Sequence, residues 1–256
     1  MSLARPKLQW QGISKSFGGN AVLDRFDLSV AAGRSLVIIG GSGQGKSVAI
    51  KLALGLMSPD GGAIALDGQD LSSLSDRARR AVFARMGVLF QGAALFDSLT
   101  VWENVAFRLL NADGVAPTVA RSRALLALQR VRLEPDVADR FPGELSGGMQ
   151  KRVGLARAIV TDPEILFFDE PTTGLDPITA GAIDALILDQ VRRLGCTAIS
   201  ITHDLASAMT IGDEIAMLHA GRIVWRGEPG RLHSSGNPYV DQFVNGRADG
   251  PLTVAP

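Results

Sequence analysis

The chain has 256 residues, of which 46% are hydrophobic, so it can bury a core large enough for a sizeable domain. The chain has 26 lysine and arginine residues and 26 aspartate and glutamate residues. This balance excludes a global electrostatic field that would attract nucleic acid or anionic lipid. The single cysteine, Cys196, excludes an internal disulfide and fits a reducing compartment. The stretch MSLARPKLQWQG lacks the apolar core of a signal peptide, and no run approaches the roughly 20 apolar residues of a membrane helix, so we expect a cytoplasmic protein.

Short apolar runs alternate with helical patterns along the chain. Residues 8–30 and 62–71 resemble antiparallel strands with Gly-Asn and Asp-Gly turns, and they predict an edge β-layer. Four other runs are continuously apolar, as strands covered on both faces should be: residues 35–40, 86–90, 164–170 and 197–202. The sequence therefore predicts an α/β fold with a parallel sheet at its core.

A helical lobe is predicted in the middle of the chain, because the strand patterns vanish between Gln91 and Val160. Helical patterns replace them at about residues 100–110, 117–133 and 147–160. We expect this lobe, at about 92–160, to be inserted into one domain that spans residues 1–236. Residues 237–256 then form a C-terminal extension.

A long helical pattern covers residues 177–195 and ends at Gly195. Its apolar positions share one face: Ile183, Leu186, Ile187 and Leu194. We expect a crossover helix that packs on the core. Cys196, which enters the next strand pattern, should be buried.

The first chemical motif is GGSGQGKS, which follows an apolar strand pattern and precedes a helical one, as a phosphate-binding P-loop requires. Glycines let backbone N–H groups turn inward around phosphate, and the helix N-terminus adds positive potential. Lys46 is predicted to hold the β- and γ-phosphates of ATP, and Ser47 to ligate Mg²⁺. The alternative is a merely flexible glycine loop. The predicted nucleotide-binding residues are Gly40, Gly41, Ser42, Gly43, Gln44, Gly45, Lys46, Ser47 and Val48.

The second motif, ILFFDE, places Asp169 and Glu170 at the carboxyl end of a buried strand, where open α/β sheets bind ligands. Asp169 suits Mg²⁺, through water, and Glu170 suits a general base that polarises attacking water. Alone, such a pair after a strand is more often a cap or a solvated feature. The P-loop favours the catalytic interpretation.

The third motif, ELSGGMQKR, lies in the predicted helical lobe. A second glycine-rich anion site has no use where one phosphate chain is already bound by the P-loop. It makes sense in a head-to-tail homodimer, in which Ser146, Gly147 and Gly148 reach the γ-phosphate held by the other chain. ATP would then form part of the interface.

Taken in order, these motifs resemble those of the nucleotide-binding subunits of ATP-binding cassette (ABC) transporters, across nearly the whole chain. The resemblance implies a P-loop NTPase cassette with a RecA-like parallel core, ATP hydrolysis and Mg²⁺. It implies that Phe17 stacks on adenine, that Gln91 of the Q-loop contacts Mg²⁺ or the attacking water, that Asp176 of the D-loop touches the opposite site, and that His203 senses the γ-phosphate. Each has a structural alternative: a core aromatic for Phe17, a helix N-cap for Asp176 and a helix-start histidine for His203. Met149 departs from the glutamine most often found in the signature.

The same resemblance implies a role for the apolar stretch LFQGAALFDSLTVWENVAF. This stretch would transmit the state of the bound nucleotide to a membrane subunit. We expect partial exposure, as a docking groove for an integral membrane permease, at Ala93, Ala94, Leu95 and Phe96. The alternative, burial in the core of the lobe, applies to Val101, Val105 and Phe107.

This stretch is also similar to the lipid-transport branch of the family, the Mla-type ATPases, although Gly92-Ala93 departs from that branch. The likeness implies phospholipid transport between the inner and outer membranes of a Gram-negative bacterium, from the cytoplasmic face of the inner membrane. It further implies a permease, an Mce-domain protein and a small accessory subunit. The tail NPYVDQFVNGRADGPL resembles the C-terminal extension of that branch. Its apolar stripe favours docking on a partner or the other protomer over a frayed tail: Tyr239, Val240, Phe243 and Val244.

Two alternatives remain: the ATPase of an ABC transporter for another solute, and a non-transport ABC protein that acts on DNA or ribosomes. The first shares every catalytic motif. The second is disfavoured by a single cassette, by the lack of a heptad insertion between Lys46 and Ser146, and by the lack of a basic surplus. We expect no nucleic-acid partner.

Overall fold

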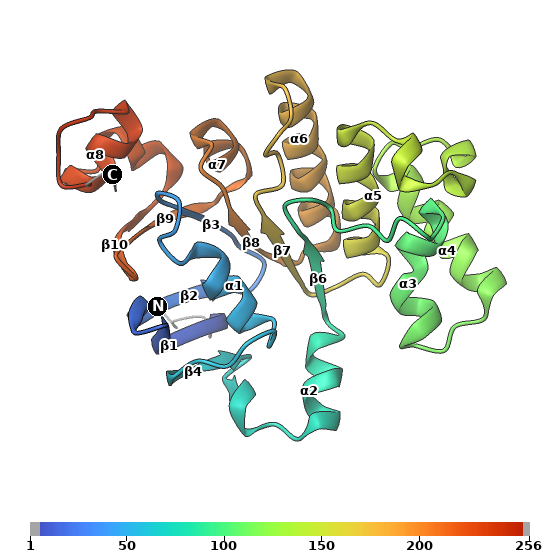
Figure 1. The fold of residues 1–256 in the computed structure, drawn as a ribbon, viewed down its shortest axis with the longest axis horizontal. Helices are drawn as coiled ribbons and strands as arrows, with labels where there is room; N and C mark the ends of the chain where they lie inside the picture. The colour runs from blue at the N-terminus through green and yellow to red at the C-terminus, as the bar shows by residue number, and fades with distance from the viewer. Residues whose placement is uncertain (1–5, 253–256) are drawn as a thin grey trace. The chain divides into compact units, whose positions relative to one another are not determined.

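The computed structural model describes residues 6–252, and the chain divides into two compact units (Figure 1). Unit 1 comprises Met1–Arg80 with Ile199–Pro256, and unit 2 comprises Ala81–Ala198. Among the described residues, no helix is long and apolar enough to cross a membrane.

Unit 1 contains a four-stranded antiparallel sheet in the order β2-β1-β4-β5, which confirms the predicted edge layer. Its strands are β1 (Pro6–Phe17), β2 (Asn20–Ala31), β4 (Gly61–Leu66) and β5 (Gln69–Asp70). Asp67 and Gly68 both have positive φ, 52° and 82°, as a two-residue hairpin turn requires. The predicted Gly-Asn turn is one residue out of place, because Asn20 already pairs with Phe17 and Gly18-Gly19 makes the turn.

A second sheet in unit 1 carries the phosphate-binding motif. Strand β3 (Ser35–Ile39) is buried at every position and pairs in parallel with β9 (Glu214–His219), which pairs with β10 (Arg222–Gly227) in antiparallel register. The sequence patterns did not predict β9 and β10. The helices of this part of the chain are α1 (Lys46–Ala53), α7 (Leu205–Ile211) and α8 (Pro238–Asn245), with short 3-10 turns at Leu71–Ser73 and Pro229–Ser234. Helix α2 (Asp76–Phe83) begins in unit 1 and ends in unit 2.

Unit 2 contains the parallel pair β6 (Met86–Leu89) and β7 (Ile165–Asp169). Strand β8 (Thr197–Ile201) begins here, where the Thr197 amide donates to the Glu164 carbonyl, and it ends in unit 1, where the Thr202 amide donates to the Ile38 carbonyl. All four predicted parallel-type runs are therefore strands.

The helices of unit 2 gather beside β6 and β7, as Figure 1 shows. They are α3 (Val101–Asn111), α4 (Pro117–Arg130), α5 (Gly147–Ile159) and α6 (Pro177–Leu194), with 3-10 turns at Pro135–Asp139 and Pro142–Glu144. A Cβ atom on Gly87 of β6 would lie 2.1 Å from the Ala158 carbonyl oxygen, so only glycine allows α5 to pack this closely on the strand. The predicted crossover helix is α6, which ends at Gly195 and buries its apolar face, although Leu194 in the last turn is only half-buried.

Candidate nucleotide-binding and hydrolysis site

Unit 1 holds the P-loop between β3 and α1, in a backbone shape that needs glycine. Gly40, Gly43 and Gly45 have φ values of 146°, 75° and 98°. A Cβ on Gly40 would lie 2.3 Å from the Leu218 carbonyl oxygen, and one on Gly45 would lie 2.8 Å from the Val22 carbonyl oxygen. The glycines therefore serve a fixed turn against neighbouring strands, which argues against a merely flexible loop.

Lys46 lies inside this turn and is only 8% exposed. Its ammonium donates to the carbonyl oxygens of Gly40 and Gly41, each at 2.8 Å, while the Gln44 side chain accepts from the Ala220 amide at 2.7 Å. These contacts hold a positive charge at the start of α1, beside backbone N–H groups. Such an arrangement suits a phosphate chain.

Phe17 lines a cleft of about 300 Å³ together with Val22 and the P-loop residues Gly43, Gln44, Gly45, Lys46, Ser47 and Val48. Its ring is 47% exposed, and the Lys15 ammonium lies 5.5 Å from the ring centroid. The core-aromatic alternative is therefore wrong. An exposed ring beside the P-loop has the placement that stacking on a base would need.

His203 also belongs to unit 1. It is exposed, and it lies two residues after the end of β8. The next residue, Asp204, caps α7 by accepting from the Ala206 and Ser207 amides at 2.8 and 3.3 Å. The cap fixes the backbone that presents His203 at the carboxyl end of the strand.

Unit 2 holds the carboxylates at the end of β7. Asp169 is 8% exposed, and Glu170 is half-buried with φ 51°, an unfavourable backbone conformation for a residue with a side chain. The Thr173 hydroxyl donates to Glu170 Oε2 at 2.9 Å and so fixes the direction of that carboxylate. Held in this way, Glu170 presents a fixed acceptor for a proton.

The signature residues begin α5. Ser146 is the N-cap residue, and its hydroxyl accepts from the Met149 amide at 3.3 Å. Ser146 and Gly147 are exposed and Gly148 is half-buried, with room for a Cβ limited by the Thr179 methyl at 2.8 Å. A helix N-terminus of this kind suits an anion.

Asp176 caps α6, which confirms the capping interpretation. It accepts from the Ile178 and Thr179 amides, both at 3.0 Å, and from the Thr179 hydroxyl at 2.6 Å. The hydroxyl bond, together with those amide bonds, holds the pKa of Asp176 below its usual range. The capping bonds favour the ionised carboxylate, which is also the form that a D-loop contact would use.

The fold thus sorts the predicted residues into two groups. Unit 1 brings Phe17 to the P-loop and also carries His203, and unit 2 carries Gln91, the signature, the two carboxylates and Asp176. A residue without a predicted role also lies in the second group. Lys151 of α5 is 6% exposed, and its ammonium donates to the carbonyl oxygens of Gln91 and Glu170.

A family model for ABC transporters matches residues 23–173, more than half of the chain. The chain is an ABC transporter ATPase.

Relatives and solved structures cover almost the whole of this ABC ATPase. It is 39% identical to a probable ribonucleotide transport ATP-binding protein (mkl) of Mycobacterium leprae, over 97% of this chain and 71% of that protein. It is 36% identical to the intermembrane phospholipid transport system ATP-binding protein MlaF of Escherichia coli strain K12, over 94% of this chain and 89% of that protein. A solved ATP-binding cassette, dimeric and bound to ADP and Pi in a post-hydrolysis state, matches with a TM-score of 0.79 and 29% identity, over 87% of this chain and 98% of that one.

The loop after Gln91 differs from the expected docking groove of this ABC ATPase at one residue. Ala93 is 1% exposed, so the expectation that it is partly exposed is wrong. Ala94 is exposed, Leu95 is half-buried, and Phe96 is 44% exposed while it stacks on Phe107 with ring centroids 4.5 Å apart. The core alternative is correct for Val101 and Val105, which are fully buried.

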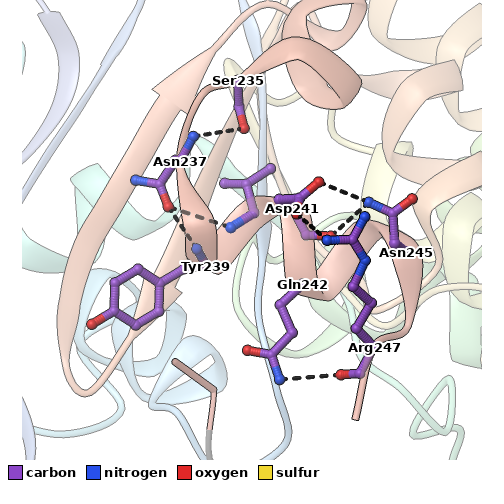
Figure 2. Close-up of polar contacts among 8 residues, drawn as sticks. Ser235, Asn237, Tyr239, Asp241, Gln242, Asn245 and Arg247 are labelled. Carbon is purple, nitrogen blue, oxygen red and sulfur yellow. Dashed lines mark hydrogen bonds and ion pairs between the residues drawn. The ribbon is translucent and has the colours of Figure 1, made fainter. Parts of the chain in front are cut away.

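The C-terminal extension of this ATPase forms a capped helix, as Figure 2 shows. Asn237 accepts from the Tyr239 and Val240 amides, and the buried side chain of Gln242 donates to the Arg247 carbonyl and accepts from the Leu252 amide. Val240 is buried, and the rest of the predicted stripe is half-buried. Residues 237–252 are therefore structured by their own contacts. Residues 253–256 of the extension, and residues 1–5 of the predicted domain, lie outside the described part of the chain.

Proposed function

We propose that this ABC ATPase drives phospholipid transport between the inner and outer membranes of a Gram-negative bacterium, from the cytoplasmic face of the inner membrane. One observation carries the proposal. The chain is 36% identical to MlaF of Escherichia coli and 38% identical to MlaF of Haemophilus influenzae, in each case over 89% of the relative. The similarity therefore extends beyond the catalytic motifs that every cassette shares.

The P-loop binds ATP in this proposal. Lys46 and the backbone N–H groups from Gly40 to Val48 hold the β- and γ-phosphates, and Phe17 stacks on adenine. The hydroxyl of Ser47, the amide of Gln91 and the carboxylate of Asp169 are oxygen donors of the kind that Mg²⁺ prefers. When bound, the ion would neutralise charge on the phosphates.

Glu170 takes a proton from the attacking water, a role worth about 10²–10⁴ in rate for a general base. The hydrogen bond from Thr173 supports this assignment, because it holds the carboxylate in one orientation. Gln91 orients the same water, and His203 senses the γ-phosphate through its exposed ring.

Two copies of the chain close head to tail over two ATP molecules. Ser146, Gly147 and Gly148 of one copy complete the site around the γ-phosphate held by the other, and Asp176 touches that opposite site. Exposure of Ser146 and Gly147 at the start of α5 supports this role, as does the dimeric state of a solved cassette with similar structure. Hydrolysis removes the shared γ-phosphate and reopens the dimer.

A permease docks on the loop from Gln91 to Thr100, where exposed Phe96 and its partner Phe107 offer apolar surface. An Mce-domain protein and a small accessory subunit complete the assembly. The C-terminal extension docks on a partner or on the other protomer through Tyr239, Phe243 and Val244, which remain half-buried in the single chain. The equal numbers of acidic and basic residues argue against a nucleic-acid partner.

A second candidate is an ABC transporter ATPase for another solute. It is favoured by the relatives named for ribonucleotide transport, which are 38–39% identical over about 70% of their length. Both candidates use the same hydrolytic machinery.

The test is to purify the ATPase with the membrane proteins that accompany it and to reconstitute the assembly in vesicles. We expect ATP-dependent transfer of a fluorescent phospholipid to acceptor vesicles, and no transfer with Lys46→Ala. Movement of a ribonucleotide, with the phospholipid left in place, would select the second candidate. If no membrane protein accompanies the ATPase, both transport proposals are wrong.

A further inference from the structure

Helix α5 places the ammonium group of Lys151 in the interior of unit 2, against backbone carbonyl oxygens. Lys151 is 6% exposed, although lysine usually keeps its ammonium in water. It donates to the Gln91 carbonyl and, at 3.5 Å, to the Glu170 carbonyl. Burial lowers the pKa of Lys151, and the charges of Glu170 and Asp169 oppose that shift. This buried charge, whose removal from water is unfavourable, bridges two loops. One carries Gln91, predicted to orient the attacking water, and the other carries Glu170, the predicted base.

A second cation, Arg157, extends from the same helix to the same loop. Its guanidinium donates to the Ala94 carbonyl at 2.7 Å and to the Ala93 carbonyl. Ala93 and Ala94 have φ values of 58° and 48°, which non-glycine residues adopt only where their surroundings impose them. The planar guanidinium donates from two nitrogens to two successive carbonyl oxygens, and these two bonds fix the backbone conformation of the loop.

Close packing joins the helix to the loop as well. A Cβ on Gly154 of α5 would lie 3.2 Å from the Ala93 Cβ and 2.7 Å from Leu89 Cδ1. The buried methyl group of Ala93 therefore rests directly on the helix backbone, with no space between them. Lys151, Gly154 and Arg157 are spaced three residues apart, so they form one face of α5.

We propose that Lys151 and Arg157 lock the Q-loop to the signature helix, so that movement of Ser146 reaches Gln91 and the permease-docking loop as a rigid-body motion, and that Lys151 is a positioning residue for Glu170. The proposal rests on the roles proposed above for Glu170, Gln91 and Ser146. A helix rises 1.5 Å per residue, so α5 carries the motion over roughly 16 Å from Ser146 to Arg157.

The test of Lys151 uses steady-state ATP hydrolysis by the complete transporter. Lys151→Met should lower kcat at least tenfold and change KM for ATP less than twofold, because the carbonyls lose their donor while the P-loop is untouched. Lys151→Arg should restore most of kcat. The control is Arg121→Met, which removes a surface ion pair with Asp139 in the same unit and lies outside the predicted motifs; it should keep the wild-type kcat. A wild-type kcat in Lys151→Met would overturn the positioning role. If Lys151→Met does not fold, Lys151→Gln is measured instead, and a wild-type kcat in that variant would overturn the role in the same way.

The test of Arg157 uses the stimulation of ATPase activity by the permease. Arg157→Met should reduce that stimulation at least fivefold and speed hydrogen exchange of the amides in residues 91–96 at least tenfold. The control is Arg121→Met, which removes a surface ion pair with Asp139 in the same unit and should change neither quantity. Unchanged stimulation and exchange in Arg157→Met would overturn the lock.

The variant Glu170→Gln distinguishes a failure of the proposed hydrolysis site from a failure of the proposed lock. If Glu170→Gln hydrolyses ATP at the wild-type rate, the proposed site is wrong. If Glu170→Gln is inactive while Lys151→Met and Arg157→Met behave as wild type, only the lock is wrong. Neither result depends on the cargo.

Discussion

Asn104 is a buried residue of α3 whose side chain anchors the loop that precedes this helix, and replacing it with alanine should destabilise the protein strongly. The residue is fully buried, and its Oδ1 accepts from the Phe96 amide at 2.7 Å. Its Nδ2 contacts the carbonyl oxygens of Phe96, Leu99 and Thr100, each at 3.0 Å. One side chain thus binds both ends of the loop from Phe96 to Thr100.

The magnitude follows from the number of bonds that one amide can make. Nδ2 has two hydrogens, so its three contacts count as about two hydrogen bonds, and Oδ1 adds one. At about 1 kcal/mol net for each, Asn104→Ala should lower the free energy of unfolding by about 3 kcal/mol. For a chain of this size, that loss corresponds to a fall in Tm of roughly 6–12 °C.

Urea denaturation followed by circular dichroism measures this loss, and hydrogen exchange at the Phe96 amide locates it. Asn104→Asp should destabilise at least as much, because it keeps the acceptor for the Phe96 amide but places a carboxylate against carbonyl oxygens. The control is Asn111→Ala on the same helix, where an exposed side chain donates only to the Phe107 carbonyl; it should cost less than about 0.5 kcal/mol. A loss below about 1 kcal/mol for Asn104→Ala, or a loss equal to that of the control, would show that these hydrogen bonds do not hold the loop.

The nucleotide site and the buried thiol can be tested in the same way. Glu170→Gln should bind ATP, hydrolyse it about 10²–10⁴ times more slowly and accumulate as a dimer in size-exclusion chromatography; wild-type turnover would refute the base assignment. Gly40→Ala should abolish ATP binding or folding, because its Cβ would lie 2.3 Å from the Leu218 carbonyl oxygen, whereas Gly41→Ala meets nothing closer than 3.7 Å and should bind ATP in a filter assay. Burial raises the pKa of the Cys196 thiol from 9.0 to about 11, so a thiol reagent at pH 8 should react with it only after unfolding. The folded thiol keeps its proton to higher pH than the unfolded thiol, so the free energy of unfolding is unaffected by this group below pH 9 and should fall as the pH rises through about 11. Urea titrations across that range would detect the fall.

Much of the fold could be predicted because its signals are local. A continuous apolar run indicates a strand covered on both faces, and all four such runs are strands. The P-loop is equally local, since the φ values of Gly40, Gly43 and Gly45 require glycine at those positions. Strands β9 and β10 are harder to predict, although β9 is largely buried, because a run of six residues does not distinguish a strand from part of a buried helix.

The order of the predicted motifs and the elements that carry them can be derived from the amino-acid sequence, because a glycine-rich turn and a buried strand both leave local patterns in it. The contacts of the polar side chains depend instead on how distant segments pack. Lys151 meets the Gln91 carbonyl across 60 residues and Arg157 meets the Ala93 carbonyl across 64, and no local pattern encodes such pairs. For the same reason, Ala93 looked like exposed docking surface in the sequence, yet it is buried against Gly154. Folding brings distant backbone carbonyls to these side chains, and that proximity makes α5 and the Q-loop one packed body.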